Sequence, residues 1–434
     1  MDRYQVATGK APRVNGHVLD ELEWRGLIAN STDLDALRAE LSAGAVTLYC
    51  GFDPTAPSLH MGNLLQLVTV RRLQDAGHRP LGLVGGATGM IGDPKQTEER
   101  RLNPAEVVAE WTERVRRQVA RVLSFEGDNA AIVVNNYDWT KDLPTLDFLR
   151  DIGKHFPVNK MLARDVVRSR LETGISYTEF SYVLLQSMDY LRLFERYGCR
   201  LQTGGSDQWG NITGGVDLIR RVTGERVHAL ATPLITKADG TKYGKTESGT
   251  VWLDPEMMSP YAFYQFWINS DDADVVSLLK YFTFRSRDEI AELEQQVADK
   301  PSLRTAQRAL ADDVTTLVHG ADETARVKAA AAALFGGGDL RSLDVATLEA
   351  ALLEAPHVEI DRQAELPTYV DLLAQTALVA SKGAGRRTVA EGGAYINNVR
   401  IADAESRPGH DDLLPGGWLI LRRGKRSLAG VKVG

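Results

Sequence analysis

Apolar residues in the first half of the chain alternate between short β-prone runs and stretches at helical spacing. Residues 47–52 form a β-prone run, and residues 61–73 then place apolar side chains at intervals of three and four until Gly77. The run 79–84 predicts the next strand. Strands that alternate with helices indicate an α/β fold with a parallel, doubly wound sheet, in which ligands bind where the carboxyl ends of strands meet helix N-termini.

The next part of the chain continues this pattern up to about residue 232. A helix is predicted to begin at Asn103-Pro104-Ala105-Glu106, because an N-cap residue precedes a proline at the first helical position and a carboxylate at the third. The segments expected after it are strands at 131–134 and 199–203, a helix at 178–197, and an insertion over about 128–176.

The pattern changes after Asp254. Residues 255–340 show helical periods and no convincing strand, which predicts an all-helical domain, and the looser stretch 336–357 is expected to be a linker. Turn signals at Asn397-Asn398 and Gly424-Lys425 interrupt the strand-like runs near the end of the chain. The final elements are predicted to be helices at 369–380 and 385–391 and strands within 394–401 and 418–433.

Composition narrows the class of protein. The chain has 434 residues, of which 43% are hydrophobic and 25% charged, and these values exclude a mainly disordered or collagen-like protein. Every apolar stretch is far shorter than a membrane span requires, and the N-terminus lacks the apolar core of a signal peptide. Two cysteines cannot form a disulfide framework, so we expect a reduced, cytoplasmic protein with no membrane partner.

Charge is distributed unevenly along the chain. The segment 381–434 carries 10 Lys/Arg and 5 Asp/Glu, a net charge of +5, whereas the whole chain has −7 and the remainder therefore −12. Such a basic end indicates a polyanionic partner, although a basic surface in contact with solvent alone gives the same pattern.

One dense polar segment covers residues 49–64, with the sequence YCGFDPTAPSLHMGNL. A strand is expected to end at Phe52, two prolines turn the chain, and a helix begins near His60. The unpaired N–H groups and dipole of that helix favour a phosphate, and Gly62 lets a ligand approach the backbone. Taken alone, the segment also fits an ordinary loop between strand and helix.

A second segment, residues 237–246, reads KADGTKYGKT. Gly240 and Gly244 make it mobile, and its three lysines suit an anion clamp, although a basic surface loop has the same composition. Glycine-rich stretches at 85–94 and 204–211 also follow predicted strands, and neither fits a P-loop or the pattern GxGxxG.

Three polar residues share one face of the helix expected at 178–197. Tyr182, Gln186 and Asp189 are spaced four and three residues apart, so they lie within one arc of the helix surface. Their neighbours are apolar, so this polar stripe either faces solvent or lines a pocket.

These segments together resemble the tyrosyl branch of the class I aminoacyl-tRNA synthetases. HMGN stands in the place of the HIGH signature, and KYGKT stands in the place of KMSKS, in the same order along the chain as in the family. The runs YCGFDPTAPSL and FSYVLLQSMDY match the tyrosyl branch. Asn63 replaces the second histidine of HIGH, and KYGKT differs from KMSKS at three positions.

The resemblance implies binding residues for tyrosine and ATP. The ammonium group of tyrosine would be held by Asp93, Tyr182 and Gln186, and its phenol by Asp189 assisted by Tyr49. Gln208 would contact the reacting carboxyl group, and Asp207 and Gly205 the ribose. The full ATP set is Cys50, Gly51, Asp53, His60, Gly62, Asn63, Gly205, Asp207, Lys242, Lys245 and Thr246. The catalytic set is Thr55, His60, Gln208, Lys242 and Lys245. No metal site is expected in the protein, and Mg²⁺ would accompany the nucleotide.

The resemblance also implies a domain order: a Rossmann-like catalytic domain at 1–232, a mobile loop and linker at 233–254, an anticodon-binding helical domain at 255–340, a linker at 341–357, and a small α+β RNA-binding domain at 358–434. Cations expected to contact RNA are Lys382, Arg386, Arg387, Arg422 and Arg423, supported by Lys425 and Arg426. A homodimer is implied, with its interface in the insertion 128–176.

The implied reaction is ATP-dependent activation of L-tyrosine to tyrosyl-adenylate, followed by transfer of tyrosine to the 3′ end of its tRNA. Three alternatives remain. The tryptophanyl branch shares the motifs, but Asp189 with Tyr49 suits a phenol. A nucleotidyltransferase with an HxGH-type site usually has one short domain. A synthetase-like RNA-binding protein without catalysis would be supported by loss of His60 or of a loop lysine, and these residues are present.

Overall fold

The computed structural model describes residues 16–95, 102–238, 240–241, 243–246, 249–334, 339–361, 365–424 and 427–434, with the backbone alone at 245 and 246. The chain forms two compact units. The first contains residues up to 257 together with 270–318, and the second contains 258–269 and 319–434. Among the described residues, no helix is long and apolar enough to cross a membrane.

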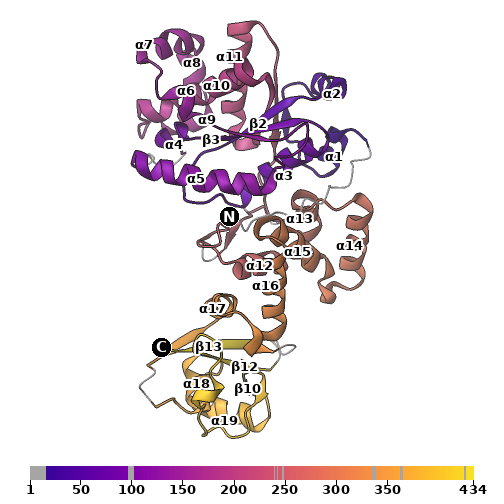
Figure 1. The fold of residues 1–434 in the computed structure, drawn as a ribbon, viewed down its shortest axis with the longest axis vertical. Coiled ribbons are helices and arrows are strands. Elements are labelled where there is room, and N and C mark those ends of the chain that lie inside the picture. The colour runs from indigo at the N-terminus through magenta and orange to yellow at the C-terminus, as the bar shows by residue number, and fades with distance from the viewer. Residues whose placement is uncertain are drawn as a thin grey trace. The chain divides into compact units, whose positions relative to one another are not determined.

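A six-stranded sheet organises the first unit (Figure 1). Its strand order is β1-β6-β5-β2-β3-β4; β1 at the edge is antiparallel and the other pairs are parallel. The strand bounds are β1 Asn30–Ser31, β2 Thr47–Phe52, β3 Arg79–Val84, β4 Ile132–Asn135, β5 Cys199–Gly205 and β6 His228–Thr232. The predicted α/β fold is confirmed, and the chain order reverses beside β2, where ligands of such sheets bind.

Helices connect the strands of this unit. Their bounds are α1 Val18–Trp24, α2 Leu34–Ala43, α3 Met61–Asp75, α4 Thr88–Ile91, α5 Ala105–Val122, α6 Tyr137–Thr140, α7 Thr145–Asp147, α8 Val158–Leu162, α9 Asp165–Arg170, α10 Tyr177–Tyr197 and α11 Trp209–Thr223. After β6 come the hairpin β7 Lys245–Thr246 and β8 Gly249–Thr250, then α13 Val275–Phe282, α14 Arg287–Asp299 and α15 Thr305–His319.

The core of the first unit lies between the sheet and α10. Met188 and Leu193 of α10 are completely buried, and the ring of Tyr49 on β2 lies 5.2 Å from that of Tyr190. The helix is long because Ser176 caps its first turn through its hydroxyl and Gly198 ends it in the left-handed conformation, at φ 62°. This packing fixes α10 beside the carboxyl end of β2.

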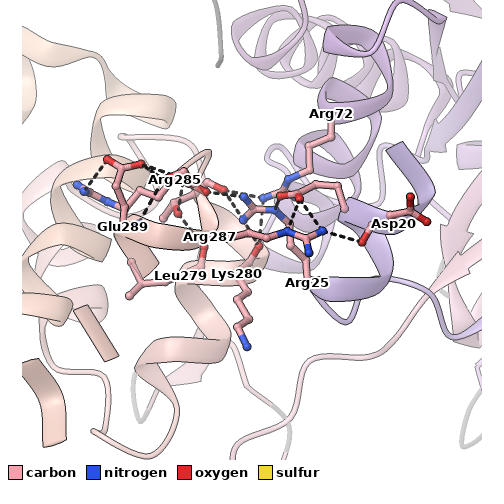
Figure 2. A network of polar contacts seen from close by, with 11 residues as sticks. Asp20, Arg25, Arg72, Leu279, Lys280, Arg285, Arg287 and Glu289 are labelled. Carbon is pink, nitrogen blue, oxygen red and sulfur yellow. Dashed lines mark hydrogen bonds and ion pairs between the residues drawn. The ribbon is translucent and has the colours of Figure 1, made fainter. Parts of the chain in front are cut away.

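Within the first unit, two buried arginines hold α13 against α1 and α3 (Figure 2). Arg25, which follows α1, donates to the carbonyl groups of Lys280, Thr283 and Arg285 at 2.7, 3.0 and 2.6 Å. Arg72 of α3 donates to the Thr283 carbonyl at 2.7 Å. Guanidinium groups satisfy carbonyls that a helix C-terminus leaves unpaired and oppose its dipole. The helices of 255–340 are therefore divided, because α13 packs on α3 within the first unit.

The second unit is built on a five-stranded sheet in the order β11-β10-β12-β13-β9. Its strands are β9 His357–Ile360, β10 Ala394–Ile396, β11 Val399–Arg400, β12 Trp418–Arg423 and β13 Ser427–Val433. Its helices are α12 Pro260–Ile268, α16 Ala321–Leu334, α17 Val345–Leu353, α18 Tyr369–Gln375 and α19 Lys382–Ala390. The predicted turn between β10 and β11 is confirmed, since Asn397 and Asn398 have φ values of 47° and 67°.

Several predicted boundaries differ from the structure. The N-cap position of α5 is taken by Pro104 rather than Asn103, because the extended backbone of the proline, at ψ 148°, delays the helix by one residue. The linker expected at 336–357 was wrong in part, because α17 forms there. Its first turn is capped by the Asp344 carboxylate, and Leu348 and Leu352 are completely buried. The helix expected to reach residue 380 ends at Gln375, before Ala377 at φ 58°.

Candidate active site

The N-terminus of α3 begins at the first sequence motif. His60 is the N-cap residue; its Nδ1 accepts from the Gly62 amide at 3.1 Å. Partial desolvation lowers the pKa of His60, against the opposing charge of Asp207. A neutral imidazole that accepts at Nδ1 carries its proton on Nε2, so His60 presents an N–H donor at the helix N-terminus.

Asn63, which departs from the family motif, has a structural contact. Its Oδ1 accepts from the backbone N–H of His60 at 3.0 Å and completes a capping box. Only the oxygen of the amide is used in this cap, so its nitrogen remains a hydrogen-bond donor for the ATP contact implied by the resemblance. Replacement of histidine by asparagine is therefore compatible with an ordered α3 N-terminus.

The carboxylate of Asp189 on α10 is buried, at 2% exposed. Its two oxygens accept from Asn136 Nδ2 at 2.9 Å and from Trp139 Nε1 at 2.8 Å. Burial raises the pKa of Asp189 to about 7, although both donors act to lower it. These two donors thus hold the carboxylate in a fixed orientation on α10.

Beside it, the hydroxyl of Tyr49 is buried and has no hydrogen-bond partner among the described residues. Burial raises the pKa of Tyr49 far above its usual value, and the charge of Asp189 contributes to the same shift. A buried hydroxyl without a partner is costly unless a ligand supplies one. Tyr49 and Asp189 therefore offer a neutral hydroxyl and a carboxylate to one polar ligand group.

Tyr182 connects α10 to the end of β2. Its hydroxyl donates to Asp53 Oδ2 at 2.7 Å, while the hydroxyl of Thr88 donates to Asp53 Oδ1 at 2.6 Å. Gly85 makes room for this carboxylate, because a Cβ there would overlap Asp53 Oδ1. Burial and the Asp53 charge raise the pKa of Tyr182, so the side chain remains a phenol. The structure places Asp53 in direct contact with a residue that the motif comparison assigned to tyrosine.

The polar stripe of α10 faces the interior. Tyr182 and Asp189 are both buried, and Oε1 of Gln186 is a buried atom without a partner in the described part of the chain. Of the two possibilities left open by the spacing, the solvent-facing one was wrong.

A second polar group lies at the carboxyl end of β5. Asp93 accepts from Gln208 Nε2 at 2.8 Å and from Asn211 Nδ2 at 3.0 Å. The carboxylate of Asp207 lies close against Gly205, because a Cβ at Gly205 would overlap Asp207 Oδ1. Asp207 itself is exposed. Its charge acts to raise the pKa of His60, so the end of β5 and the start of α3 contribute to the same site.

The two signature motifs meet at the start of α3. Gly244 of the second motif has a φ of 94°, which favours glycine, and a Cβ there would lie 2.7 Å from Met61 Cε, so the two motifs are in close contact. Tyr243 shares a 2.8 Å hydrogen bond with the hydroxyl of Ser270. Lys242 and the side chains of Lys245 and Thr246 lie outside the described part of the structure.

Comparison with known proteins agrees with this geometry. A family model for class I tRNA synthetases of the W and Y types matches residues 41–336, and one for the C-terminal domain of SYY-like tyrosine–tRNA ligases matches 347–429. A tyrosine–tRNA ligase of Streptomyces avermitilis is 64% identical over 96% of this chain and 99% of its own length. The corresponding protein of Thermobifida fusca is 58% identical over 95% and 99%. The chain belongs to the tyrosine–tRNA ligase family.

Solved structures give the same result for the fold of this family member. A truncated mitochondrial tyrosyl-tRNA synthetase of Aspergillus nidulans is similar at TM-score 0.66 and 31% identity, over 72% of this chain and 92% of the other. A tryptophanyl-tRNA synthetase of Plasmodium falciparum shares the fold at TM-score 0.52 and 14% identity, over 80% and 92%. The family resemblance carried by the sequence motifs is confirmed.

Some polar groups of this tyrosine–tRNA ligase family site were missed by the sequence analysis. Asn136 and Trp139 hold Asp189, Thr88 holds Asp53, and Asn211 holds Asp93. Asn136 and Trp139 follow β4, so the rule that ligand-binding residues follow parallel strands was a usable signal for them. Thr88 and Asn211 lie inside the two glycine-rich stretches that had been singled out.

Other assigned residues have simpler surroundings. Burial raises the pKa of Cys50 to about 12, so its thiol is protonated and unreactive. Thr55 and Gly51 are exposed beside the end of β2. The structure contains no group of three or more metal-ligating side chains among the residues that it describes.

The cations of the second unit differ in exposure. Lys382 pairs with Asp371 at 2.5 Å and Arg386 with Glu405 at 2.6 Å, and all four side chains reach solvent. Arg387 and Arg423 are exposed, whereas Arg422 is 8% exposed and stacks on Tyr395 with its Cζ 4.4 Å from the ring centre. Lys425 and Arg426 lie outside the described residues.

Proposed function

We propose that the crevice between β2, β5 and the N-terminus of α3 binds tyrosine and ATP, and that the chain is an ATP-dependent tyrosine–tRNA ligase. The observation that carries the substrate assignment is the unpartnered Tyr49 hydroxyl beside Asp189. A phenol hydroxyl donates to the carboxylate and accepts from Tyr49, so it satisfies both groups. An indole N–H only donates, and it leaves the Tyr49 hydroxyl without an acceptor, which disfavours tryptophan.

The α-amino and carboxyl groups of tyrosine bind at the other end of the pocket. Asp93 and the buried Oε1 of Gln186 supply acceptors for the ammonium group. Tyr182 lies on α10 one turn before Gln186, and its hydroxyl fixes Asp53. Gln208 is the donor that contacts the reacting carboxylate.

The reaction proceeds in two steps. The tyrosine carboxylate attacks the α-phosphate of ATP and pyrophosphate leaves, and the terminal adenosine of tRNA(Tyr) then takes the tyrosyl group. The carboxylate is the nucleophile, so catalysis requires alignment and stabilisation of phosphate charge rather than a general base. His60 Nε2–H, the α3 N-terminus, Thr55, Lys242 and Lys245 supply that stabilisation, and Asp207, Gly205 and Asn63 hold the ribose. Mg²⁺ enters with the nucleotide phosphates.

The remaining parts of the chain bind tRNA and a second copy. Residues 255–340 bind the anticodon region, and residues 358–434 bind RNA through Lys382, Arg386, Arg387 and Arg423, which reach solvent. A homodimer forms through 128–176, where large apolar side chains are exposed, among them Leu146 at 78%, Val158 at 61% and Leu171 at 50%. The protein acts in the cytoplasm, where its tRNA substrate is used.

ATP–pyrophosphate exchange measured with each of the twenty amino acids tests this function. Exchange that depends on tyrosine and exceeds that with tryptophan and phenylalanine by at least about a thousandfold supports it. Exchange with tryptophan instead, or with no amino acid, would exclude it. Sedimentation of the purified protein tests the dimer separately.

A further inference from the structure

A closed hydrogen-bond network surrounds the buried amide of Asn211, which is 2% exposed in the first turn of α11. Its Nδ2 donates to Asp93 Oδ1 at 3.0 Å and to Gln208 Oε1 at 2.9 Å. Its Oδ1 accepts from the guanidinium of Arg164, which lies between α8 and α9. Both donor hydrogens and the oxygen of this amide are therefore engaged inside the network.

Arg164 determines the orientation of that amide. A guanidinium has donors only, so the oxygen of Asn211 must face Arg164 and the nitrogen must face the two acceptors. The guanidinium lies against the start of α11, where a Cβ built at Gly210 would be in van der Waals contact with Arg164 Nε at 3.4 Å. A flip of the amide that exchanged its oxygen and nitrogen would place donor against donor and would cost more than one hydrogen bond.

Gln208 is oriented by the same contacts. Its Oε1 faces Asn211, so its Nε2 is directed at Asp93 Oδ2, 2.8 Å away. Under the proposed function, Asp93 receives the substrate ammonium and Gln208 the substrate carboxylate. In the structure, Gln208, the proposed donor to the carboxylate, is therefore hydrogen-bonded to Asp93, the proposed acceptor for the ammonium group.

We infer that Asn211 and Arg164 are positioning residues that couple recognition of the α-ammonium group to recognition of the α-carboxylate. This inference rests on the proposed function. Asn211 holds Asp93 and Gln208 at one separation, which suits two groups attached to the same α-carbon. When the ammonium group binds Asp93, it takes over the acceptor that Gln208 used, and the Gln208 N–H becomes available to the carboxylate. A ligand with only one of the two groups gains no such coupling.

Three ligands separate this coupling from simple packing: tyrosine, tyramine, which lacks the carboxylate, and 3-(4-hydroxyphenyl)propionate, which lacks the ammonium group. Their dissociation constants are measured by calorimetry for the wild-type chain and for Asn211→Ala. We expect Asn211→Ala to weaken tyrosine about 10- to 100-fold and each single-group analogue less than about threefold. Equal losses for all three ligands, or no loss for tyrosine, would overturn the inference.

Arg164 provides a second variant, which leaves the Asn211 side chain in place and removes only its guanidinium partner. Arg164→Met should raise the KM for tyrosine in ATP–pyrophosphate exchange about 3- to 10-fold, and Arg164→Lys, which keeps a donor, should recover most of that loss. Arg168→Met is the matched control, because Arg168 on α9 is 69% exposed and forms its ion pair with Asp165. A tyrosine KM for Arg164→Met within twofold of that control would contradict the role. A wild-type chain that activates no tyrosine would overturn the proposed function itself.

Discussion

Tyr182 on α10 and Asp53 after β2 are joined by a 2.7 Å hydrogen bond across 129 positions of the chain. Under the proposed function, Asp53 belongs to the nucleotide side of the crevice and Tyr182 to the tyrosine side, and this bond then fixes the two binding sites relative to each other. Tyr182→Phe removes only the donor. We expect kcat/KM for tyrosine activation to fall about 3- to 10-fold and the free energy of unfolding to fall by about 1 kcal/mol. Pyrophosphate exchange and urea unfolding measure these two quantities; an unchanged kcat/KM would show that the bond does not position either ligand.

Asp189 should give the stability of the first unit a distinctive pH dependence. The unfolded carboxyl group titrates near 3.8, whereas burial raises the folded pKa to about 7. Between these values the folded state binds more protons than the unfolded state, so this group makes the protein less stable as pH rises from about 4 to 7, with no further change above. Asp189→Asn should remove that contribution and flatten the slope of unfolding free energy against pH in this window.

The same titration affects ligand binding. A phenol that donates to Asp189 prefers the ionised carboxylate, so tyrosine affinity should rise between about pH 6 and 8 and level off above. Dissociation constants measured across this range test the expectation. Asp189→Asn, which lacks the titrating group, is the control, and it should bind tyrosine weakly at every pH. An affinity of the wild type that does not vary with pH would contradict the assignment.

The two arginines at the C-terminus of α13 should differ in importance. Arg25 satisfies three carbonyl groups, whereas Nε and Nη1 of the buried Arg72 have no hydrogen-bond partner among the described residues. Arg25→Met should therefore lower the free energy of unfolding by about 2 to 4 kcal/mol, and Arg72→Met by less, because it also removes a costly buried charge. Arg38→Met, which breaks an exposed pair with Asp20, is the control and should cost under about 1 kcal/mol. Urea unfolding that ranks Arg72 above Arg25 would contradict this account.

The exposed cations of the second unit should serve tRNA charging and not tyrosine activation. Replacing Lys382, Arg386, Arg387 and Arg423 together by alanine should leave pyrophosphate exchange within about twofold of wild type and should weaken tRNA binding. The slope of log K against log salt should become shallower by about 3, because each lost phosphate contact reduces it by about 0.7 to 0.9. Arg220→Ala on α11 is the control, because Arg220 is also exposed and lies outside the segments proposed to bind RNA. An unchanged salt slope would show that these cations contact solvent and do not bind RNA phosphates.

The sequence predicted regular elements well where hydrophobic spacing was strong. Strands β2 and β3 have the bounds expected from their apolar runs, because both are buried on two faces. Helix α17 was missed because it is short. Its stability comes from a few buried leucines and a carboxylate cap rather than from a long periodic pattern of apolar residues. Local signals for the α5 N-cap also failed, since Pro104 adopts an extended ψ.

The site was predictable where a motif lay next to a strand end, as with His60 and Gly62. Contacts made only through tertiary packing were not. Asn136 and Trp139 follow the short strand β4. Their hydrogen bonds to Asp189 could not be predicted from the local sequence, because Asp189 lies far along the chain. The orientation of Gln208 depends on Asn211 and Arg164 together, so it required the packing of α11 against the segment between α8 and α9.

Recognition of the substrate phenol by Tyr49 and Asp189 is the central claim, and one ratio tests it directly. The ratio is kcat/KM for tyrosine divided by kcat/KM for phenylalanine in pyrophosphate exchange, compared between the wild type and Tyr49→Phe. Removing the Tyr49 hydroxyl deletes one hydrogen bond to tyrosine and relieves an unpartnered hydroxyl in the phenylalanine complex, so the ratio should fall at least about tenfold. A ratio that stays within twofold of wild type would show that the buried hydroxyl of Tyr49 does not contact the substrate.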